Sequence, residues 1–432
     1  MPVVKPVRKG AKLANTTEFT AEAAEDIRVG DSITVGYRFG ETLKCSFSTV
    51  SKVLCAAYTL DGKRLFVGTN ESPEITVYDC SDYSQVSSFT IDGLPYAIAF
   101  KPNSSHAAIL VNGYHNPAGE MYDGSRHNTV CVYDANTFEL LWWYDLGQSE
   151  AVSNGSHGVA QYSSTGRYLL TSSYQSYQSG ELKVFTTSAL PYTETEAPVG
   201  YQVSAPVVRG AAYNHDDSML ALAYNGYVGL YDNTGAYPRE VAFSSDAPFV
   251  SSGQSWTLFE YSSDESRLCL AEQSTSGSAY VYIYDVTSSS IVVLKKGTQV
   301  PIHYNTNGSV CAVTPDSYRV MTATATGFAR WKPHQVYDVS AALPLSIDLP
   351  ELPEPHMTTD MISYLLFEPD GSGFVFFGCT ADDSSALGTA YVYSCKKYVC
   401  KATLNNSKQA VGVGYAINSA KAGEVCTVAL FY

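Results

Sequence analysis

The amino-acid sequence predicts an all-β fold, a β-propeller of about eight four-stranded blades, with seven blades as the alternative. Three observations support this fold. A unit of about fifty residues recurs along the chain, a short polar turn recurs at one place in it, and an aromatic residue followed by aspartate recurs at another. A repeat of this length that contains several short strands is typical of propeller blades.

The polar turn separates the first two predicted strands of each unit. Aspartate, asparagine, glycine and proline fill it, because these residues tolerate a positive φ or hydrogen-bond to their own backbone where a chain reverses. Each turn therefore predicts a hairpin. The eight turns, of which the last is the weakest, are at residues 60–64, 102–105, 164–167, 215–218, 263–266, 315–318, 369–372 and 418–421.

The aromatic residue and aspartate end the third predicted strand. They occur as Val77-Tyr78-Asp79, Val132-Tyr133-Asp134, Leu230-Tyr231-Asp232 and Ile283-Tyr284-Asp285. Phe185, Trp331 and Tyr393 take the corresponding place in other units, without the aspartate. Two markers in a fixed order are stronger evidence for a repeat than one.

The two ends of the chain are predicted to close the ring together. The last unit holds only two predicted strands, at residues 411–417 and 424–432, and two alternating segments at residues 32–39 and 43–49 have no unit of their own. Pairing these four strands would leave no sheet edge open. The predicted domains are an extended N-terminal arm, residues 1–30, with a short helical turn near residues 20–26, and a propeller, residues 31–432. Seven blades would result if the unit around residues 94–147 were incomplete.

With these markers, the chain resembles the WD-repeat and YVTN-type β-propeller family. The resemblance is clearest in DGKRLFVGT, residues 61–69, followed by ITVYD, residues 75–79, and it covers roughly residues 50–432. The units lack the Gly-His pair and the Trp-Asp pair of WD repeats. The resemblance therefore implies the propeller fold rather than a particular scaffold function.

Composition excludes several function classes. The net charge of −15 and the pI near 4.9 argue against nonspecific nucleic-acid binding, which needs lysine and arginine to neutralise phosphates. No run of eighteen apolar residues predicts a membrane-spanning helix, and the N-terminus lacks the apolar run of a secretory signal. Most of the ten cysteines lie in apolar runs and are expected to be free. Cys395 and Cys400 could face each other across a tight hairpin, which leaves a disulfide open.

Two loops are candidates for ligand binding. The first, residues 112–128, interrupts its unit and contains Tyr114, His115, Tyr122, Asp123 and Arg126. Its tyrosines and arginine offer flat surfaces and hydrogen bonds of the kind that recognise sugars or proteins. A plain exposed loop and a metal site are the alternatives, although the histidine spacing is not that of a metal motif, so no metal is predicted.

The second candidate loop, residues 172–178, contains Tyr174 and Tyr177. If both loops lie on the same face of the ring, they form one patch. The alternative is that tyrosines cluster by chance in a chain that has 33 of them.

The sequence does not favour catalysis. It contains no GxSxG, HExxH, phosphate-loop or CxxC motif, and its turn aspartates are expected as turn formers. His106, His157, His215 and His303 could converge on the central channel of a ring, which is the basis of an enzyme alternative. A non-enzymatic protein without a cofactor is the expectation.

The leading functional expectation is a virion component of a tailed bacteriophage, made in the host cytoplasm. Its N-terminal arm would anchor it to other protein chains, and its ring would contact a host surface glycan or protein. The arm is basic on an acidic body, which favours docking to an acidic neighbour, through Lys5, Arg8, Lys9 and Lys12. The alternative is a cytoplasmic scaffold or sensor propeller that binds protein or carbohydrate.

Overall fold

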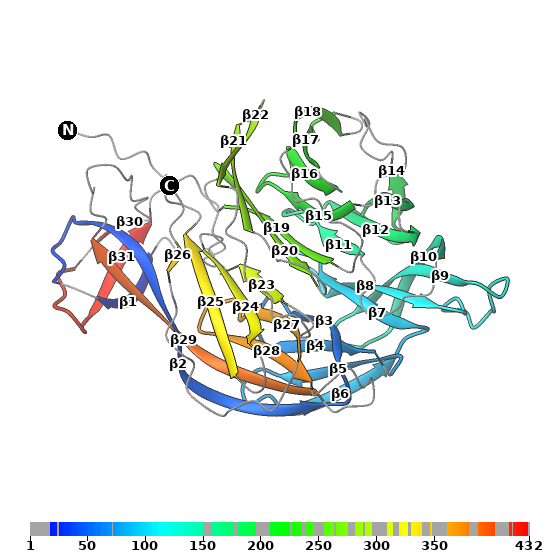
Figure 1. Cartoon of the computed structure of the whole chain (residues 1–432), viewed down its shortest axis with the longest axis horizontal. Helices are drawn as coiled ribbons and strands as arrows, with labels where there is room; N and C mark the ends of the chain where they lie inside the picture. The colour runs from blue at the N-terminus through cyan, green and yellow to red at the C-terminus, as the bar shows by residue number, and fades with distance from the viewer. Residues whose placement is uncertain are drawn as a thin grey trace.

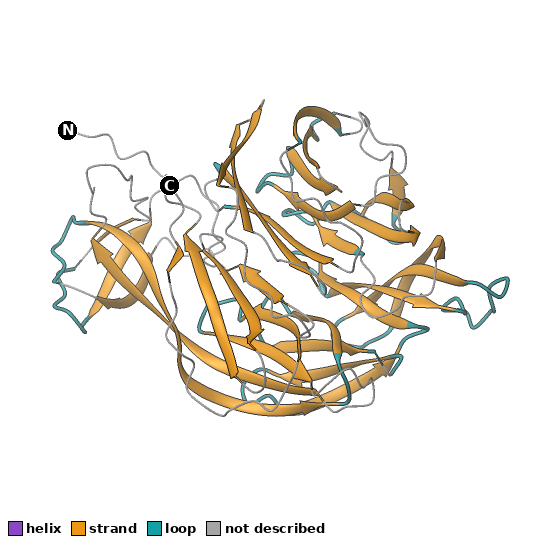
Figure 2. Ribbon diagram, in the orientation of Figure 1, coloured by secondary structure: helices purple, strands orange, loops and turns teal. Residues whose placement is uncertain are grey.

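The structure is a computed structural model. It describes residues 18–23, 26–70, 72–149, 158–176, 179–195, 208–224, 227–235, 238–245, 255–262, 265–274, 281–287, 290–295, 309–313, 319–326, 330–338, 346–347, 361–379, 388–401, 414–416 and 418–430. These residues contain no helix, and their strands form a ring of small sheets (Figure 2).

Six antiparallel sheets of four consecutive strands make the first six blades. Blade 1 consists of β3 (Val53–Tyr58), β4 (Arg64–Thr69), β5 (Glu74–Asp79) and β6 (Gln85–Thr90). Blade 2 consists of β7 (Leu94–Phe100), β8 (His106–Gly113), β9 (Arg126–Asp134) and β10 (Leu140–Ser149). Blade 3 consists of β11 (Val159–Tyr162), β12 (Tyr168–Ser176), β13 (Ser179–Thr186) and β14 (Thr193–Thr195). Blade 4 consists of β15 (Val208–Tyr213), β16 (Met219–Tyr224), β17 (Tyr227–Asp232) and β18 (Arg239–Ser244). Blade 5 consists of β19 (Ser255–Tyr261), β20 (Arg267–Ser274), β21 (Val281–Thr287) and β22 (Ser290–Lys295). Blade 6 consists of β23 (Ser309–Val313), β24 (Arg319–Thr326), β25 (Arg330–Asp338) and β26 (Ser346–Ile347).

The seventh blade joins strands from both ends of the chain. It consists of β27 (Met361–Phe367), β28 (Gly373–Cys379), β29 (Gly388–Lys401) and, on its outer side, β2 (Ser32–Thr49). The first strand of each blade contacts the first strand of the next, and β27 contacts β3. The fold is therefore a closed β-propeller, as the sequence predicts (Figure 1).

The recurring turns are the hairpins between the first and second strands. In six blades the residue before the turn donates its backbone N–H across the hairpin, as Thr59 does to the oxygen of Arg64 at 2.9 Å. One residue of each of these turns has a positive φ, for which glycine, asparagine and aspartate are favoured. These residues are Gly62, Asn103, Gly166, Asp217, Glu265 and Gly371.

The aromatic residue and the aspartate of the second signature have separate tasks. The ring of the aromatic residue is buried, with Tyr284 fully enclosed. In blades 1, 2 and 4 the following aspartate accepts the backbone N–H two residues later, as in Asp79 from Ser81 at 2.8 Å and Asp232 from Thr234 at 2.9 Å. Asp285 of blade 5 instead forms an ion pair with Arg267. The signature thus fixes both the core and the hairpin to the fourth strand.

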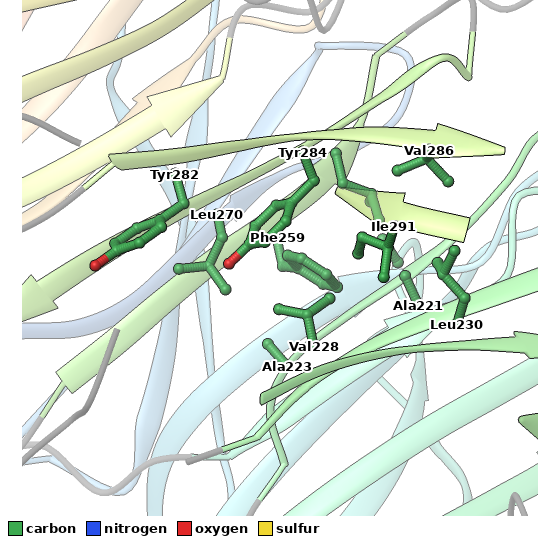
Figure 3. Packing of buried hydrophobic residues seen from close by; sticks show 12 residues of the cluster. Ala221, Ala223, Val228, Leu230, Phe259, Leu270, Tyr282, Tyr284, Val286 and Ile291 are labelled. Atoms are coloured by element: carbon green, nitrogen blue, oxygen red, sulfur yellow. The ribbon is translucent and has the colours of Figure 1, made fainter. Parts of the chain in front are cut away.

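The core lies between blades rather than within them. Each buried cluster joins two neighbouring blades, from blades 7 and 1 through to blades 4 and 5. Figure 3 shows Phe259 of β19 between Tyr284 of its own blade and Val228 of blade 4. Because each sheet buries both faces against its neighbours, the ring must close for the end blades to be covered.

The N-terminal strands pair with the C-terminal strands, as the sequence predicts, but these pairs are not the ones that complete a blade. Residues 32–49 form one long strand, β2, and residues 43–49 pair with residues 388–393 of β29 instead of with the C-terminal strands. The closing unit is therefore the one at residues 361–401. The unit at residues 94–147 is a complete blade, blade 2, and the seven-blade alternative holds because the last unit is not a blade.

The C-terminal strands extend the sheet of the seventh blade outside the ring. β30 (Gly414–Ala416) and β31 (Val425–Leu430) pair with each other, β30 pairs with the start of β2, and β31 pairs with β1 (Glu18–Ala23). β1 also pairs with the end of β29, so these five strands close on themselves. Residues 18–23 are thus a strand, and the short helical turn predicted near residues 20–26 is wrong.

Cys395 and Cys400 lie on one strand. Both belong to β29, where Cys395 pairs with Phe39 and Cys400 with Thr34. Five residues of extended strand separate two Cα atoms by about 16 Å, far beyond disulfide range. The tight hairpin predicted between them is absent from this described strand, and Cys395 is a free, buried thiol.

Candidate functional site

The candidate site is the hairpin between β8 and β9, residues 113–126, referred to here as the blade 2 hairpin. It joins the second and third strands of its blade, so it lies at the opposite end of the strands from the recurring turns. In Figure 1 it extends away from the ring beyond β9 and β10. The sequence predicts this segment as a candidate binding loop, and five of the predicted residues lie on it.

Asn116 organises the tip of this hairpin. Its side-chain oxygen accepts the backbone N–H groups of Ala118 at 3.0 Å and Glu120 at 2.9 Å. Its amide group donates to the Glu120 carboxylate at 3.0 Å, and Gly119 supplies the positive φ that the turn requires. The tip is therefore a defined turn, closed by a buried asparagine.

Beyond the turn, the hairpin exposes two large apolar or aromatic side chains, Tyr114 and Met121. His115 and Met121 form a bridge across it, and the backbone N–H of Tyr122 donates to the oxygen of Tyr114 at 2.9 Å. Met121 is 71% exposed and Tyr114 is 47% exposed. A rigid backbone thus holds an apolar and an aromatic side chain in solvent.

Arg126 lies over the ring of Tyr114. Its guanidinium carbon is 4.8 Å from the ring centroid, a cation–π arrangement, and one of its Nη atoms donates to Asn112 Oδ1 at 3.4 Å. Asn112 is buried and donates to Asn128 Oδ1 at 3.0 Å. A buried polar ladder therefore positions Arg126, and Arg126 restricts the ring of Tyr114.

His127 connects the hairpin to the outer strand β10. Its ring stacks on Tyr122 with centroids 3.9 Å apart, and its Nδ1 lies 2.9 Å from Asp145 Oδ2. Asp123 accepts from Gln148 Nε2 at 2.7 Å, which forms a second tie to β10. Burial raises the pKa of Tyr122. The hydroxyl and the backbone N–H of Ser125 hold the pKa of Asp123 below its usual value.

The turn between β6 and β7 packs closely against the base of the hairpin. A Cβ atom on Gly113 would lie 2.1 Å from the backbone oxygen of Asp92, and one on Gly93 would lie 2.5 Å from the backbone oxygen of Asn112. Side chains do not fit at either position. The hairpin is thus held between β10 on one side and the connection from blade 1 to blade 2 on the other.

The remaining predicted residues are not part of this cluster. The second loop joins β12 to β13, so it leaves the same end of the strands as the blade 2 hairpin, as the prediction of a shared face requires. The structure places the backbone of Tyr174 on β12 but does not describe its side chain. Outside the described residues lie Tyr177 and the arm residues Lys5, Arg8, Lys9 and Lys12. A single patch formed by both loops stays a prediction.

Sequence reasoning missed the residues that support the hairpin. Asp145 and Gln148 come from β10, about twenty residues away, and only the pairing of β9 with β10 brings them to His127. Asn116 could have been found, because an Asn-Pro pair followed by Ala-Gly is a turn signal. Among the described residues, no group of three histidine, cysteine, aspartate or glutamate side chains is arranged to hold a metal ion.

The histidines proposed for the channel lie at separate blade contacts. His106 Nδ1 is 2.6 Å from the hydroxyl of Tyr192, between blades 2 and 3. The backbone N–H of His215 donates to Glu265 at 2.6 Å, between blades 4 and 5. His157 and His303 are outside the described residues. No helix in the described part of the chain could cross a membrane.

Comparisons with known proteins place the fold. No family model matches the chain, and no curated protein matches its sequence. It is similar in structure to the β-propeller domain of Cps50 (Swd1) from Myceliophteria thermophila, with a TM-score of 0.55 and 9% identity over 81% of this chain and 99% of that one. It is also similar to a chain of the Mitotic Checkpoint Complex, with a TM-score of 0.53 and 11% identity over 83% of this chain and 93% of that one. These similarities support the β-propeller fold.

Proposed function

We propose that this chain is a non-enzymatic binding module that contacts a protein partner through the blade 2 hairpin. The observation that carries the proposal is a rigid hairpin that presents Tyr114 and Met121 to solvent. Tyrosine and arginine are frequent among residues that dominate binding energy, and methionine adapts to irregular partner surfaces. The internal hydrogen bonds of the hairpin reduce the ordering cost of binding.

A protein is favoured over a glycan as the partner. Arg126 covers one face of the Tyr114 ring, so at most one face is left to stack on a sugar. The exposed Met121 adds apolar surface without a hydrogen-bonding group. That one of the two structural neighbours is a chain of a protein complex agrees with this choice.

Site-specific photo-cross-linking tests the proposal. The full chain would carry a photoreactive residue at Met121, and a matched chain would carry it at Leu60, which is 49% exposed in a recurring turn of blade 1. We expect the chain labelled at position 121 to give one discrete protein adduct, and we expect that adduct to be lost when Tyr114→Ala is added. The chain labelled at position 60 should give no adduct of that mass. Equal adducts from both positions would contradict the proposal.

The virion role and the partner-docking arm are further proposals with a separate test. Deleting residues 1–17 removes Lys5, Arg8, Lys9 and Lys12 and leaves β1, which begins at Glu18. If the arm anchors the chain to a virion, the shortened chain folds but is missing from purified particles. Normal incorporation of the shortened chain would eliminate the arm as the anchor.

A further inference from the structure

His127 lies between two carboxylates at the base of the blade 2 hairpin. Its Nδ1 is within 3.0 Å of both oxygens of Asp145, and its Nε2 is 3.7 Å from Asp123 Oδ1. The side chain is only 13% exposed. Among the described residues, Nε2 has no hydrogen-bond partner. Nδ1 therefore has hydrogen-bond partners, whereas Nε2 faces the carboxylate of Asp123 without a hydrogen bond.

The two charge states of this ring differ in how well they fit the site. In the neutral ring the proton belongs on Nδ1, where both oxygens of Asp145 can accept it. The lone pair of Nε2 then points toward the carboxylate of Asp123, which is unfavourable. In the protonated ring both nitrogens donate, so the same histidine can bond to Asp145 and Asp123.

The two charged groups that face this ring are carboxylates. The facing groups are Asp123 from the hairpin, Asp145 from β10 and the stacked ring of Tyr122. Burial raises the pKa of Tyr122, with smaller contributions from Asp145 and from Asp92 at the β6–β7 turn, so Tyr122 stays neutral. The adjacent cation, Arg126, is held by Tyr114 and Asn112.

We infer that His127 is a proton-operated clamp, which ties Asp123 on the hairpin to Asp145 on β10 when the imidazole is charged. The clamp closes when the imidazole gains its second proton, so acidification is the condition under which it is tested. The clamp itself depends only on geometry. Its consequence, tighter partner binding at acidic pH, rests on the proposed function of the hairpin.

Hydrogen exchange of the full chain tests the clamp without any partner. Peptides that cover residues 114–126 would be compared at pH 5.5 and pH 7.5, after correction for the intrinsic pH dependence of exchange. One additional charge-assisted hydrogen bond predicts about fivefold greater protection at pH 5.5. Equal corrected protection at the two pH values would overturn the inference.

Three variants make the result specific. His127→Gln and Asp123→Asn should each abolish the pH dependence, and Asp123→Asn keeps the imidazole and Asp145 if His127→Gln disturbs packing. His115→Gln is the matched control, because His115 is an exposed histidine of the same hairpin, and it should leave the pH dependence intact. A pH effect that survives Asp123→Asn and His127→Gln would refute the clamp. A clamp that works while the Met121 cross-link fails would refute only the proposed function.

Discussion

The two ends of the propeller use the same kinds of polar side chain for different purposes. At the end with the recurring turns, polar groups tie blade to blade. The described examples are Arg64 to the oxygen of Ala135, Lys101 to the oxygen of Thr187, Ser163 to Asp217, the N–H of His215 to Glu265, and Tyr83 to Glu368. At the blade 2 hairpin, the described polar contacts stay within one blade.

This difference indicates that the links between blades contribute to the stability of the ring and that the contacts within the hairpin shape a recognition surface. Links between blades hold a ring whose core lies at blade interfaces, so their loss should weaken the whole fold. Contacts within the hairpin hold only the hairpin, so their loss should change a surface and leave the ring intact. Substitutions between blades should therefore destabilise the ring, and substitutions in the hairpin should not.

The largest effect is expected at the seam between blades 7 and 1. Glu368 is 9% exposed and accepts from Tyr83 at 2.7 Å and from Lys44 at 2.8 Å, and Ser372 also donates to it. Glu368→Ala leaves these donors without their acceptor and should lower the free energy of unfolding by about 3 kcal/mol. Urea unfolding measures this value. Glu120→Ala in the hairpin is the acidic control and should change it by less than about 0.5 kcal/mol.

A second large effect is expected between blades 3 and 4. The buried carboxylate of Asp217 accepts from the hydroxyl of Ser163 at 2.8 Å and from the N–H of Thr165 at 3.1 Å. Asp217→Ala should cost about 2 kcal/mol, because these donors lose their acceptor and alanine tolerates the positive φ poorly. Asp217→Asn retains an acceptor and should recover part of the loss. If the two variants were equally stable, the link would not contribute as described.

The hairpin should respond locally. Asn116→Ala removes the acceptor for Ala118 and Glu120 and should make their amides exchange about fivefold faster. The urea midpoint of the ring should not move. A fall in global stability would show that the hairpin belongs to the same cooperative unit as the blades and would weaken the comparison.

The smallest effect concerns acid stability. Hydrogen bonds from the hydroxyl and the N–H of Thr234 lower the pKa of Asp232 in the folded state. A lowered folded pKa gives stability that is present above the unfolded value, near pH 3.9, and is lost as the pH falls through the folded value. Below about pH 4, the urea midpoint of the wild-type chain should decrease, and the urea midpoint of the Asp232→Asn chain should decrease less. An identical fall in both chains would exclude this contribution.

The sequence predicted the parts of the fold that depend on local signals. The turn around Gly62 and the Tyr78-Asp79 pair mark hairpins and buried strands within a few residues, and both are where the pattern places them. Closure was harder, because the pairing of β2 with β29 joins residues more than three hundred positions apart. Alternation alone does not select a partner strand. The turn at residues 418–421 is a real hairpin turn, but its strands extend the sheet of blade 7 instead of forming a blade of their own.

The candidate site was predictable in position but not in geometry. The interruption at residues 112–128 marked the loop, and Tyr114, Tyr122 and Arg126 marked its chemistry. The pairing of Arg126 with Tyr114 and the ties from His127 to Asp145 depend on how β8, β9 and β10 align. Such contacts follow from sheet register, which no local pattern in this chain determines.

The affinity of the cross-linked partner for variants of the full chain tests whether the blade 2 hairpin is the recognition surface. The Tyr114→Ala, Met121→Ser chain should bind about tenfold more weakly than wild type, with an unchanged urea midpoint. A control chain with Val86→Ser, a 52% exposed residue on β6, should bind as wild type does. Unchanged affinity of the hairpin variant, or equal losses in both variants, would contradict the assignment of recognition to the blade 2 hairpin.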